Sequence, residues 1–329
     1  MNYKVLDSIK NSDEDALKEQ FSQDVLTGFT SEKKYLSSKY FYDDKGSELF
    51  VKITDLEEYY PTKAEEEILE NNKQKIVSHF NTQKLNVVEL GAGDGHKTKL
   101  LLDELFNNDV PLEYNPIDIS EDAIKGVCEK LNKDDFETFG IVGEYIPALK
   151  WANKNKEGKK LVLFLGSNIG NFSLHDSLVF LRTIWKNLSK DDHILIGFDM
   201  KKDINLLINA YNDDKGVTSE FNLNVLNRMN NELGANFVIG SFQHFGTYNP
   251  NIGAMESYLI STKSQTVRVD YLEKNFHFDE FEAIHLEYSF KYLQKDIEYL
   301  AKETGFEIVE NFSDKKGHFV DSLWRVIKE

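Results

Sequence analysis

The sequence predicts an α/β fold built on a doubly wound parallel sheet. From about residue 68 onward, apolar strand-like segments alternate with amphipathic helical segments, and runs such as Leu161-Val-Leu-Phe-Leu165 are wholly apolar. Strands of this kind are buried on both faces, which is typical of a parallel sheet covered by helices. One strand also runs directly into a glycine-rich loop and then a helix, over residues 85–106. Together these observations favour the doubly wound class.

The elements of this sheet follow one another along the chain. The expected strands are Leu85–Leu90, Tyr114–Ile119, Thr138–Val142, Leu161–Leu165 and Ile194–Phe198, and the expected helices are Lys97–Phe106, Asp122–Leu131 and Leu174–Leu188. The C-terminal part adds a helix, Gln294–Thr304, with Gly305 as its C-cap, and then strands at Phe306–Glu310 and Ser322–Ile327. We expect these last two strands to form an antiparallel hairpin.

Two regions break the alternation of strand and helix. Residues 1–70 look helical with a loop, while residues 201–288 contain two helical patterns and then strand-like segments. We therefore predict two domains: a smaller, discontinuous α+β domain of residues 1–70 and 201–288 that binds the substrate as a lid, and a cofactor-binding domain of residues 71–200 and 289–329. The segments expected in the insertion are helices at Ile204–Tyr211 and Phe221–Leu233 and strands at Phe237–Phe245, Glu256–Ser261 and Thr266–Val269.

Composition argues against several classes of function. Asp and Glu number 56 against 39 Lys and Arg, which gives a net charge of −17 and disfavours nucleic acid as a partner. The N-terminus has no apolar signal segment, and no apolar run is long enough for a membrane span. The single cysteine, Cys128, excludes an intramolecular disulfide, and the eight histidines share no metal-binding spacing. We expect a cytoplasmic monomer without a metal.

The most informative local feature is the stretch Val87-Val-Glu-Leu-Gly-Ala-Gly-Asp-Gly95. Its glycines allow a tight turn and let a ligand lie on the backbone, and the helix that follows directs its free N–H groups there. A dinucleotide loop would have its third glycine at position 96, where this chain has His96. The spacing instead resembles the first motif of class I S-adenosylmethionine methyltransferases. A purely structural turn in another α/β fold is the alternative.

Polar residues follow the later strands at the sheet edge where such folds bind ligands. Asp118 ends the second strand and is a candidate acceptor for the ribose hydroxyls of S-adenosylmethionine, with a helix N-cap as the alternative. Glu144 and Tyr145 follow the third strand, where the methyltransferase resemblance implies contact with the adenine ring. The loop from Gly166 to Phe172 follows a buried strand and is expected to face the sulfonium and the substrate.

Several strings outside the glycine loop resemble the histidine Nα-methyltransferases that make hercynine, the trimethylhistidine precursor of ergothioneine. They occur in the family's order and span nearly the whole chain. The strings are Tyr40-Phe-Tyr-Asp-Asp-Lys-Gly-Ser-Glu-Leu-Phe50 with Ile53-Thr-Asp-Leu-Glu-Glu-Tyr-Tyr-Pro-Thr62, Phe164-Leu-Gly-Ser-Asn-Ile-Gly-Asn171, Ala210-Tyr-Asn-Asp-Asp-Lys-Gly-Val-Thr218 with Phe221-Asn-Leu-Asn-Val-Leu226, and Leu286-Glu-Tyr-Ser-Phe-Lys291.

This resemblance implies a set of site residues. The substrate, L-histidine, would be held through its amino and carboxylate groups by Tyr59, Asn171 and Tyr211, and through its imidazole ring by Glu287 and Ser289. Near the reacting amine, Tyr42, Tyr59 and Asn171 would act, with Tyr42, Tyr59 or a water chain accepting the proton. The implied contacts of S-adenosylmethionine are Tyr42, Phe50, Gly91, Gly93, Lys97, Asp118, Glu144, Tyr145 and Gly166.

The physical chemistry of Glu287 and Ser289 agrees with an imidazole ligand. The two residues are two positions apart, so on a strand they share a face. A carboxylate and a hydroxyl satisfy both ring nitrogens, whereas an indole would leave a polar group unsatisfied at about 1–3 kcal/mol.

Departures from the family keep other readings open. Ser257, with Met255 two places earlier, stands where the family usually has a Met near the ring, and position 144 is Glu where Asp is common. Methylation of another amino acid or aromatic amine therefore remains an alternative, as does a non-catalytic S-adenosylmethionine-binding protein. An NAD-dependent oxidoreductase is disfavoured by His96.

Overall fold

The computed structural model of the chain describes residues 2–6, 14–80, 84–131 and 136–329. It divides into two compact units. The first, here called the sheet unit, comprises Met1–Lys10, Pro61–Lys201 and Phe290–Glu329, and the second unit comprises Asn11–Tyr60 and Lys202–Ser289. The division assigns residues 1–10, 61–70 and 201, which the sequence placed with the smaller domain, to the sheet unit, and it assigns Ser289, which the sequence placed with the cofactor-binding domain, to the second unit.

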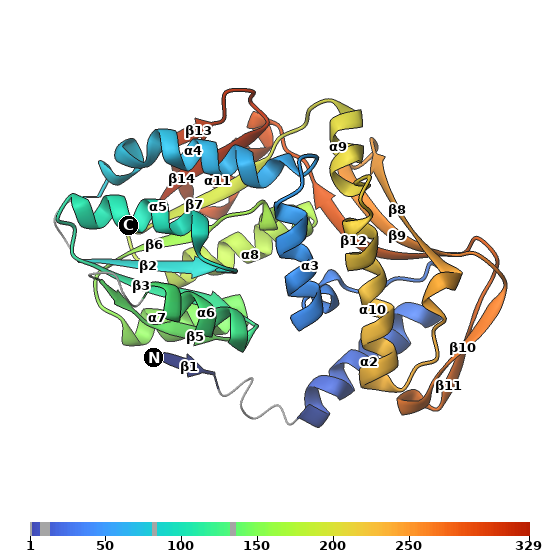
Figure 1. Cartoon of the computed structure of the whole chain (residues 1–329). Helices are drawn as coiled ribbons and strands as arrows, with labels where there is room; N and C mark the ends of the chain where they lie inside the picture. Colours follow the sequence, from blue (N-terminus) through green and yellow to red (C-terminus); the bar gives the residue numbers. More distant parts are fainter. Residues whose placement is uncertain (1, 7–13, 81–83, 132–135) are drawn as a thin grey trace. The chain divides into compact units, whose positions relative to one another are not determined.

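Over the described residues, the sheet unit contains a nine-stranded sheet in the order β1-β5-β3-β2-β6-β7-β14-β13, with β4 paired to β3 (Figure 1). Strands β1 to β7 pair in parallel, whereas β14 runs antiparallel to both β7 and β13. The C-terminal hairpin predicted from the sequence is therefore confirmed. The strands are β1 (Tyr3–Val5), β2 (Leu85–Leu90), β3 (Leu112–Asp118), β4 (Glu137–Thr138), β5 (Gly140–Val142), β6 (Lys159–Phe164), β7 (His193–Asp199), β13 (Phe306–Ser313) and β14 (Phe319–Val326).

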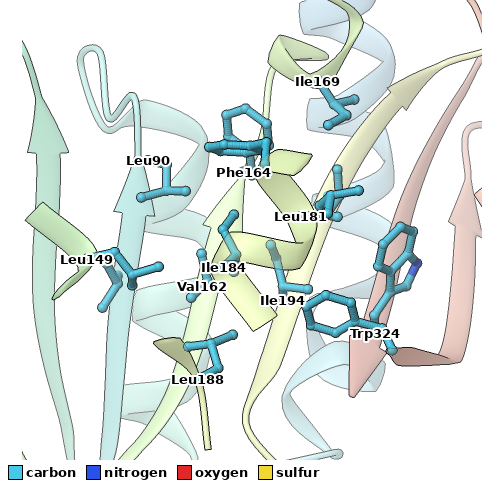
Figure 2. Close-up of a cluster of buried hydrophobic side chains, with 14 of the residues drawn as sticks. Leu90, Leu149, Val162, Phe164, Ile169, Leu181, Ile184, Leu188, Ile194 and Trp324 are labelled. Carbon is cyan, nitrogen blue, oxygen red and sulfur yellow. The ribbon is translucent and has the colours of Figure 1, made fainter. Parts of the chain in front are cut away.

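Helices cover both faces of this sheet. Side chains alternate between the two faces along each strand, so each strand contributes residues to both helix-covered clusters. Val88 and Val162 lie in one buried cluster with α7, α8 and α11, part of which Figure 2 shows. Val87 and Leu161 lie in another cluster with α4, α5 and α6. The predicted doubly wound α/β class is thus confirmed. The helices are α4 (Tyr60–Val77), α5 (His96–Asn107), α6 (Glu121–Leu131), α7 (Tyr145–Asn155), α8 (Leu174–Asn187) and α11 (Gln294–Thr304).

Strand β1 and helix α7 of the sheet unit were not predicted from the sequence. Strand β1 is only three residues long, too short for a periodic pattern, and it pairs with β5. Helix α7 carries Pro147 in its first turn, where a missing N–H breaks no intrahelical bond. Its buried residues Ala148, Leu149 and Ala152 pack onto the sheet.

The second unit combines helices with two small sheets, β12-β9-β8 and β10-β11, in which β8 runs antiparallel to β9 and β10 runs antiparallel to β11. Its core is rich in aromatic side chains; the ring of Phe29, for example, meets the rings of Phe276 and Phe278 edge-on, with centroids 5.5 Å apart. Strand β8 begins later than the sequence predicted, because residues 239–241 form a short 3-10 turn before it. The elements are α2 (Glu14–Thr30), α3 (Asp44–Thr54), α9 (Ile204–Tyr211), α10 (Val217–Leu233), β8 (Phe242–Asn249), β9 (Ala254–Ser261), β10 (Gln265–Val269), β11 (Lys274–Phe278) and β12 (Ala283–Phe290).

No helix among the described residues is both long and apolar enough to cross a membrane.

Candidate active site

The glycine loop leaves β2 in a conformation that favours glycine. Gly91, Gly93 and Gly95 have φ angles of +77°, +53° and +66°. The N–H groups of Gly91 and Ala92 donate to the carbonyl of Ile117 at 2.8 and 3.2 Å, which ties the loop to the end of β3. A Cβ atom on Gly91 would lie 2.9 Å from the hydroxyl oxygen of Tyr145. A larger residue at position 91 would therefore collide with Tyr145, so the close approach of this side chain to the loop requires glycine.

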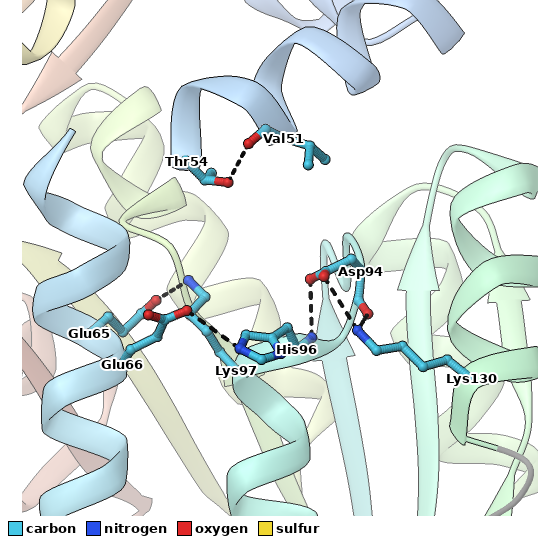
Figure 3. Close-up of polar contacts among 8 residues, drawn as sticks. All are labelled: Val51, Thr54, Glu65, Glu66, Asp94, His96, Lys97 and Lys130. Carbon is cyan, nitrogen blue, oxygen red and sulfur yellow. Dashed lines mark hydrogen bonds and ion pairs between the residues drawn. The ribbon is translucent and has the colours of Figure 1, made fainter. Parts of the chain in front are cut away.

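Asp94 and His96, at the end of the glycine loop, make contacts with other side chains. The N–H of His96 donates to Oδ1 of Asp94 at 3.0 Å, and the same carboxylate pairs with Lys130 at 3.4 Å (Figure 3). The His96 ring lies 3.8 Å from the carboxylate of Glu66 (Figure 3). These contacts account for both residues without a ligand.

The carboxylate of Asp118 faces the glycine loop. It accepts from the N–H of Gly93 at 3.4 Å and from the N–H of Ser120 at 3.0 Å. Burial raises the pKa of Asp118, and these backbone N–H groups oppose the rise. Burial, together with the charge of Asp118, also raises the pKa of Tyr145 above its usual range, so its hydroxyl remains protonated. Asp118 and Tyr145 thus offer an acceptor and a donor beside the loop.

A buried carboxylate links the start of α5 to the loop after β6. Lys97, in the first turn of α5, pairs with Glu65 of α4 (Figure 3), and Glu65 is fully buried. The other oxygen of Glu65 accepts from the N–H of Gly166 at 2.7 Å. A Cβ atom on Gly166 would lie 3.7 Å from Nζ of Lys97 and 3.6 Å from Nδ2 of Asn168. The same Asn168 nitrogen would lie 3.5 Å from a Cβ atom on Gly91.

The structure therefore brings together several cofactor residues that the sequence proposed. Gly91 and Tyr145 lie close together, as do Gly166 and Lys97, and the side chain of Asn168 lies near both glycines at the carboxyl ends of β2 and β6. Glu144 is the N-cap residue of α7 and is exposed at the same edge of the sheet. Its side chain makes no cap hydrogen bond.

The loop after β6 packs against the segment 290–292. The hydroxyl of Tyr292 donates to the carbonyl of Ile169 at 3.0 Å. A Cβ atom on Gly170 would lie 2.9 Å from the carbonyl oxygen of Phe290, so the backbones approach closely there. Asn171 ends the short 3-10 helix Asn168–Asn171 and is exposed.

In the second unit, Tyr42, Phe50 and Tyr59 form part of one aromatic group. The ring centroid of Phe50 lies 5.7 Å from that of Tyr42 and 6.3 Å from that of Tyr59, both edge-on. Phe221 of α10 contacts Tyr42 and Phe50 at 5.7 and 5.9 Å. The two strings that the sequence singled out, at 40–62 and 210–226, therefore pack against each other.

Tyr211, Glu287 and Ser289 also lie in the second unit. Tyr211 ends α9, and its carbonyl oxygen lies 2.9 Å from Nε2 of His244. Glu287 is half-buried and Ser289 is buried, both on β12. Ser257 is buried on β9, opposite Gly246 of β8.

Sequence reasoning missed Glu65 and singled out Asn168 only as part of its loop. Glu65 stands in the acidic run Glu65-Glu66-Glu67, which looks like a solvated helix face. The available signal is its spacing: Glu65 precedes the apolar Ile68 and Leu69 by three and four positions and so shares their face.

Among the residues that the structure describes, no group of three or more His, Cys, Asp or Glu side chains could hold a metal ion.

The sheet order, with one antiparallel strand inserted beside β7, and the glycine loop facing an acidic residue at the end of β3 define a class I S-adenosylmethionine-dependent methyltransferase. A family model described as "Histidine-specific methyltransferase, SAM-dependent" matches residues 21–326. The chain belongs to this family, and the family and cofactor predicted from the sequence are confirmed.

Curated relatives agree with this assignment. The histidine N-alpha-methyltransferase of Mycolicibacterium smegmatis is 33% identical over 311 residues, covering 94% of this chain and 96% of the relative. The enzyme of the same name from Mycobacterium tuberculosis is 34% identical over 312 residues, with the same coverage of 94% and 96%. Ergothioneine biosynthesis protein 1 of Neurospora crassa is 30% identical over 286 residues, which cover 85% of this chain but 32% of that protein.

Proposed function

We propose that the chain transfers methyl groups from S-adenosylmethionine to the α-amino group of L-histidine, up to three times, to give hercynine for ergothioneine biosynthesis. The observation that carries this proposal is identity of 33–34% over 94% of the chain to two relatives named histidine N-alpha-methyltransferase. The relative named ergothioneine biosynthesis protein 1 supports the same pathway.

The residues around the glycine loop fit the cofactor. Gly91 and Gly93 would let it lie on the backbone, Asp118 would accept from its ribose hydroxyls, and Lys97 would attract its carboxylate. When bound, S-adenosylmethionine supplies a methyl group on a positively charged sulfur. In this proposal Tyr42, Phe50, Glu144, Tyr145 and Gly166 complete its contacts.

The substrate contacts follow from the chemistry of histidine. Tyr59, Asn171 and Tyr211 would hold the amino and carboxylate groups, so that the amine lone pair meets the methyl carbon in line at each round. Glu287 and Ser289 would hold the imidazole nitrogens and keep the amine in the same place as methyls are added.

The α-amino group must lose a proton before each transfer, since a free amino acid carries an ammonium group near neutral pH. In this proposal the hydroxyl of Tyr42, the hydroxyl of Tyr59 or a water chain takes this proton. Asn171 would orient the amine through its side-chain amide.

The remaining features belong to the same proposal. A net charge of −17 disfavours polyanionic partners, so we expect a free amino acid rather than nucleic acid as substrate. We also expect a monomeric, cytoplasmic enzyme.

One assay tests the reaction. The full chain is incubated with labelled S-adenosylmethionine and each of the twenty amino acids, and the products are identified by mass spectrometry. We expect histidine to gain one, two and then three methyl groups. Ser257 favours the second candidate, another amino acid or aromatic amine, and methylation of such a compound without methylated histidine would support it instead. Cofactor binding with no methylated product would indicate a non-catalytic binding protein.

The ring contact is tested by Glu287→Ala. Loss of the carboxylate should raise the KM for histidine about tenfold or more, because a buried ring nitrogen loses its acceptor. Glu280→Ala, at an exposed position before β12, is the matched control and should leave the KM unchanged. An unchanged KM in Glu287→Ala would refute the ring contact while leaving methylation itself untouched.

A further inference from the structure

Glu65 is a fully buried side chain whose two oxygens serve different parts of the sheet unit. Oε1 accepts from the N–H of Gly166 at 2.7 Å, and Oε2 pairs with the ammonium of Lys97. Lys97 lies in the first turn of the helix after the glycine loop, and Gly166 lies in the loop after β6. One carboxylate therefore sets the relative position of two segments that face the cofactor region.

A second buried carboxyl group, that of Asp321, lies beside Glu65. Asp321 of β14 is fully buried and pairs across the sheet with Gly197 of β7. A Cβ atom on Gly197 would lie 2.5 Å from Oε1 of Glu65, so the Glu65 carboxylate rests against the bare backbone there. Neither oxygen of Asp321 accepts a hydrogen bond from an N–H or hydroxyl group within the described part of the chain.

Burial and the neighbouring charges decide the protonation states of Asp321 and Lys97. Burial, followed by the negative charge of Glu65, raises the pKa of Asp321 well above its usual range, while Lys97 opposes the rise. Burial disfavours the charged form of Lys97, but the attraction of Glu65 outweighs it and raises the pKa of Lys97. The negative charge of Glu89 of β2 also raises the pKa of Lys97. Glu65 and Lys97 form one buried ion pair, and a proton on Asp321 avoids a further charged carboxylate directly beside Glu65.

We propose that Asp321 and Glu65 are positioning residues for the cofactor: protonated Asp321 donates a hydrogen bond to Glu65, and Glu65 in turn fixes the ammonium of Lys97 and the N–H of Gly166. The inference rests on the proposed function only in assigning Lys97 and Gly166 to S-adenosylmethionine. It adds that a neutral hydrogen-bond donor, rather than a charge, is required at position 321.

The test compares Asp321→Asn with Asp321→Ala in the full chain, by calorimetric titration of S-adenosylmethionine. The Asn amide also donates a hydrogen bond, so its Kd should stay within about threefold of the wild type. Ala leaves Glu65 without that donor, and the Kd should rise about tenfold. Glu65→Gln removes the negative charge that pairs with Lys97 and should raise the Kd at least as much, while Glu70→Gln, exposed on the same helix, should change nothing.

Kinetics separate positioning from a general loss of structure. The variants should raise the KM for S-adenosylmethionine and leave kcat, and the KM for histidine at saturating cofactor, unchanged. Infrared difference spectra of wild type against Asp321→Asn should show the loss of a carboxylic-acid C=O band. A tenfold loss of affinity in Asp321→Asn, or the absence of that band, overturns the proposal even if Asp321→Ala fails to fold.

The wild-type protein keeps this test separate from the proposed function. If the wild-type chain binds S-adenosylmethionine but does not methylate histidine, the proposed substrate is refuted. The Kd values of the variants still test the role of Asp321 and Glu65 in that case. Wild-type affinity in both Asp321→Ala and Glu65→Gln refutes this inference and leaves the methylation reaction intact.

Discussion

Glu89, within the glycine motif itself, should make the stability of the sheet unit depend on pH. Its side chain is buried in β2, and the hydroxyls of Thr98 and Tyr114 donate to its two oxygens. Burial raises the pKa of Glu89 to about 7, although these donors and Lys97 oppose the rise. The folded protein therefore holds a proton on Glu89 at pH values where an unfolded chain has lost it.

The sign and size of the effect follow from this difference in pKa. An unperturbed Glu titrates near 4.5, so the stabilisation by the bound proton is complete below that pH and is lost as the pH rises through about 7. At about 1.36 kcal/mol for each pH unit, the change between pH 5 and pH 8 is about 2–3 kcal/mol. For a domain of this size, that corresponds to roughly 5–10 °C in Tm.

The experiment follows thermal unfolding of the wild type and Glu89→Gln from pH 5 to pH 8. Gln stays neutral, so the Tm of the wild type should fall by roughly 5–10 °C relative to the variant across this range. Glu129→Gln, at an exposed position on α6, is the control and should follow the wild type. Parallel curves for the wild type and Glu89→Gln would refute a protonated Glu89 in the folded state.

Two further predictions concern the loops. Gly91→Ala should raise the Kd for S-adenosylmethionine more than Gly93→Ala does. Both substitutions introduce the strain of a left-handed backbone, about 1–2 kcal/mol. Only at Gly91 does the new methyl group also meet a neighbouring side chain, the Tyr145 hydroxyl at 2.9 Å. Equal Kd values in titration would contradict this. Asp213→Ala should lower the free energy of unfolding by about 0.5–2 kcal/mol, because the carboxylate accepts from the first N–H groups of α10, at Val217 and Thr218, both at 2.8 Å. Thermal unfolding against the exposed Asp214→Ala is the check, and identical Tm values would exclude a capping role.

Much of the fold follows from local patterns in the sequence. The apolar runs at Leu85–Leu90 and Leu161–Leu165 predict buried parallel strands, and the bounds of helix Gln294–Thr304 agree with the structure. Short or atypical elements were not predictable in this way. Tyr3–Val5 is too short to show a period, and α7 begins with an aromatic residue, an isoleucine and a proline.

The candidate site was likewise predictable only in part. The glycine loop, Asp118 and the strings around Tyr42, Tyr59 and Tyr211 could be named from the sequence, because each depends on residues adjacent in the chain. The roles of the individual substrate residues stay predictions until the variants are measured.

By itself, the sequence determined the fold class, the methyl donor and the family of this protein, since glycine spacing, hydrophobic period and ordered strings are properties of contiguous chain. Only the tertiary structure decided how Lys97 and Gly166 are held. Glu65, Gly197 and Asp321 belong to a helix and two strands far apart in the sequence, and they meet because β14 inserts beside β7 under α4. Protonation of a buried carboxyl depends on which charges surround it in space, and that arrangement exists only in the folded chain.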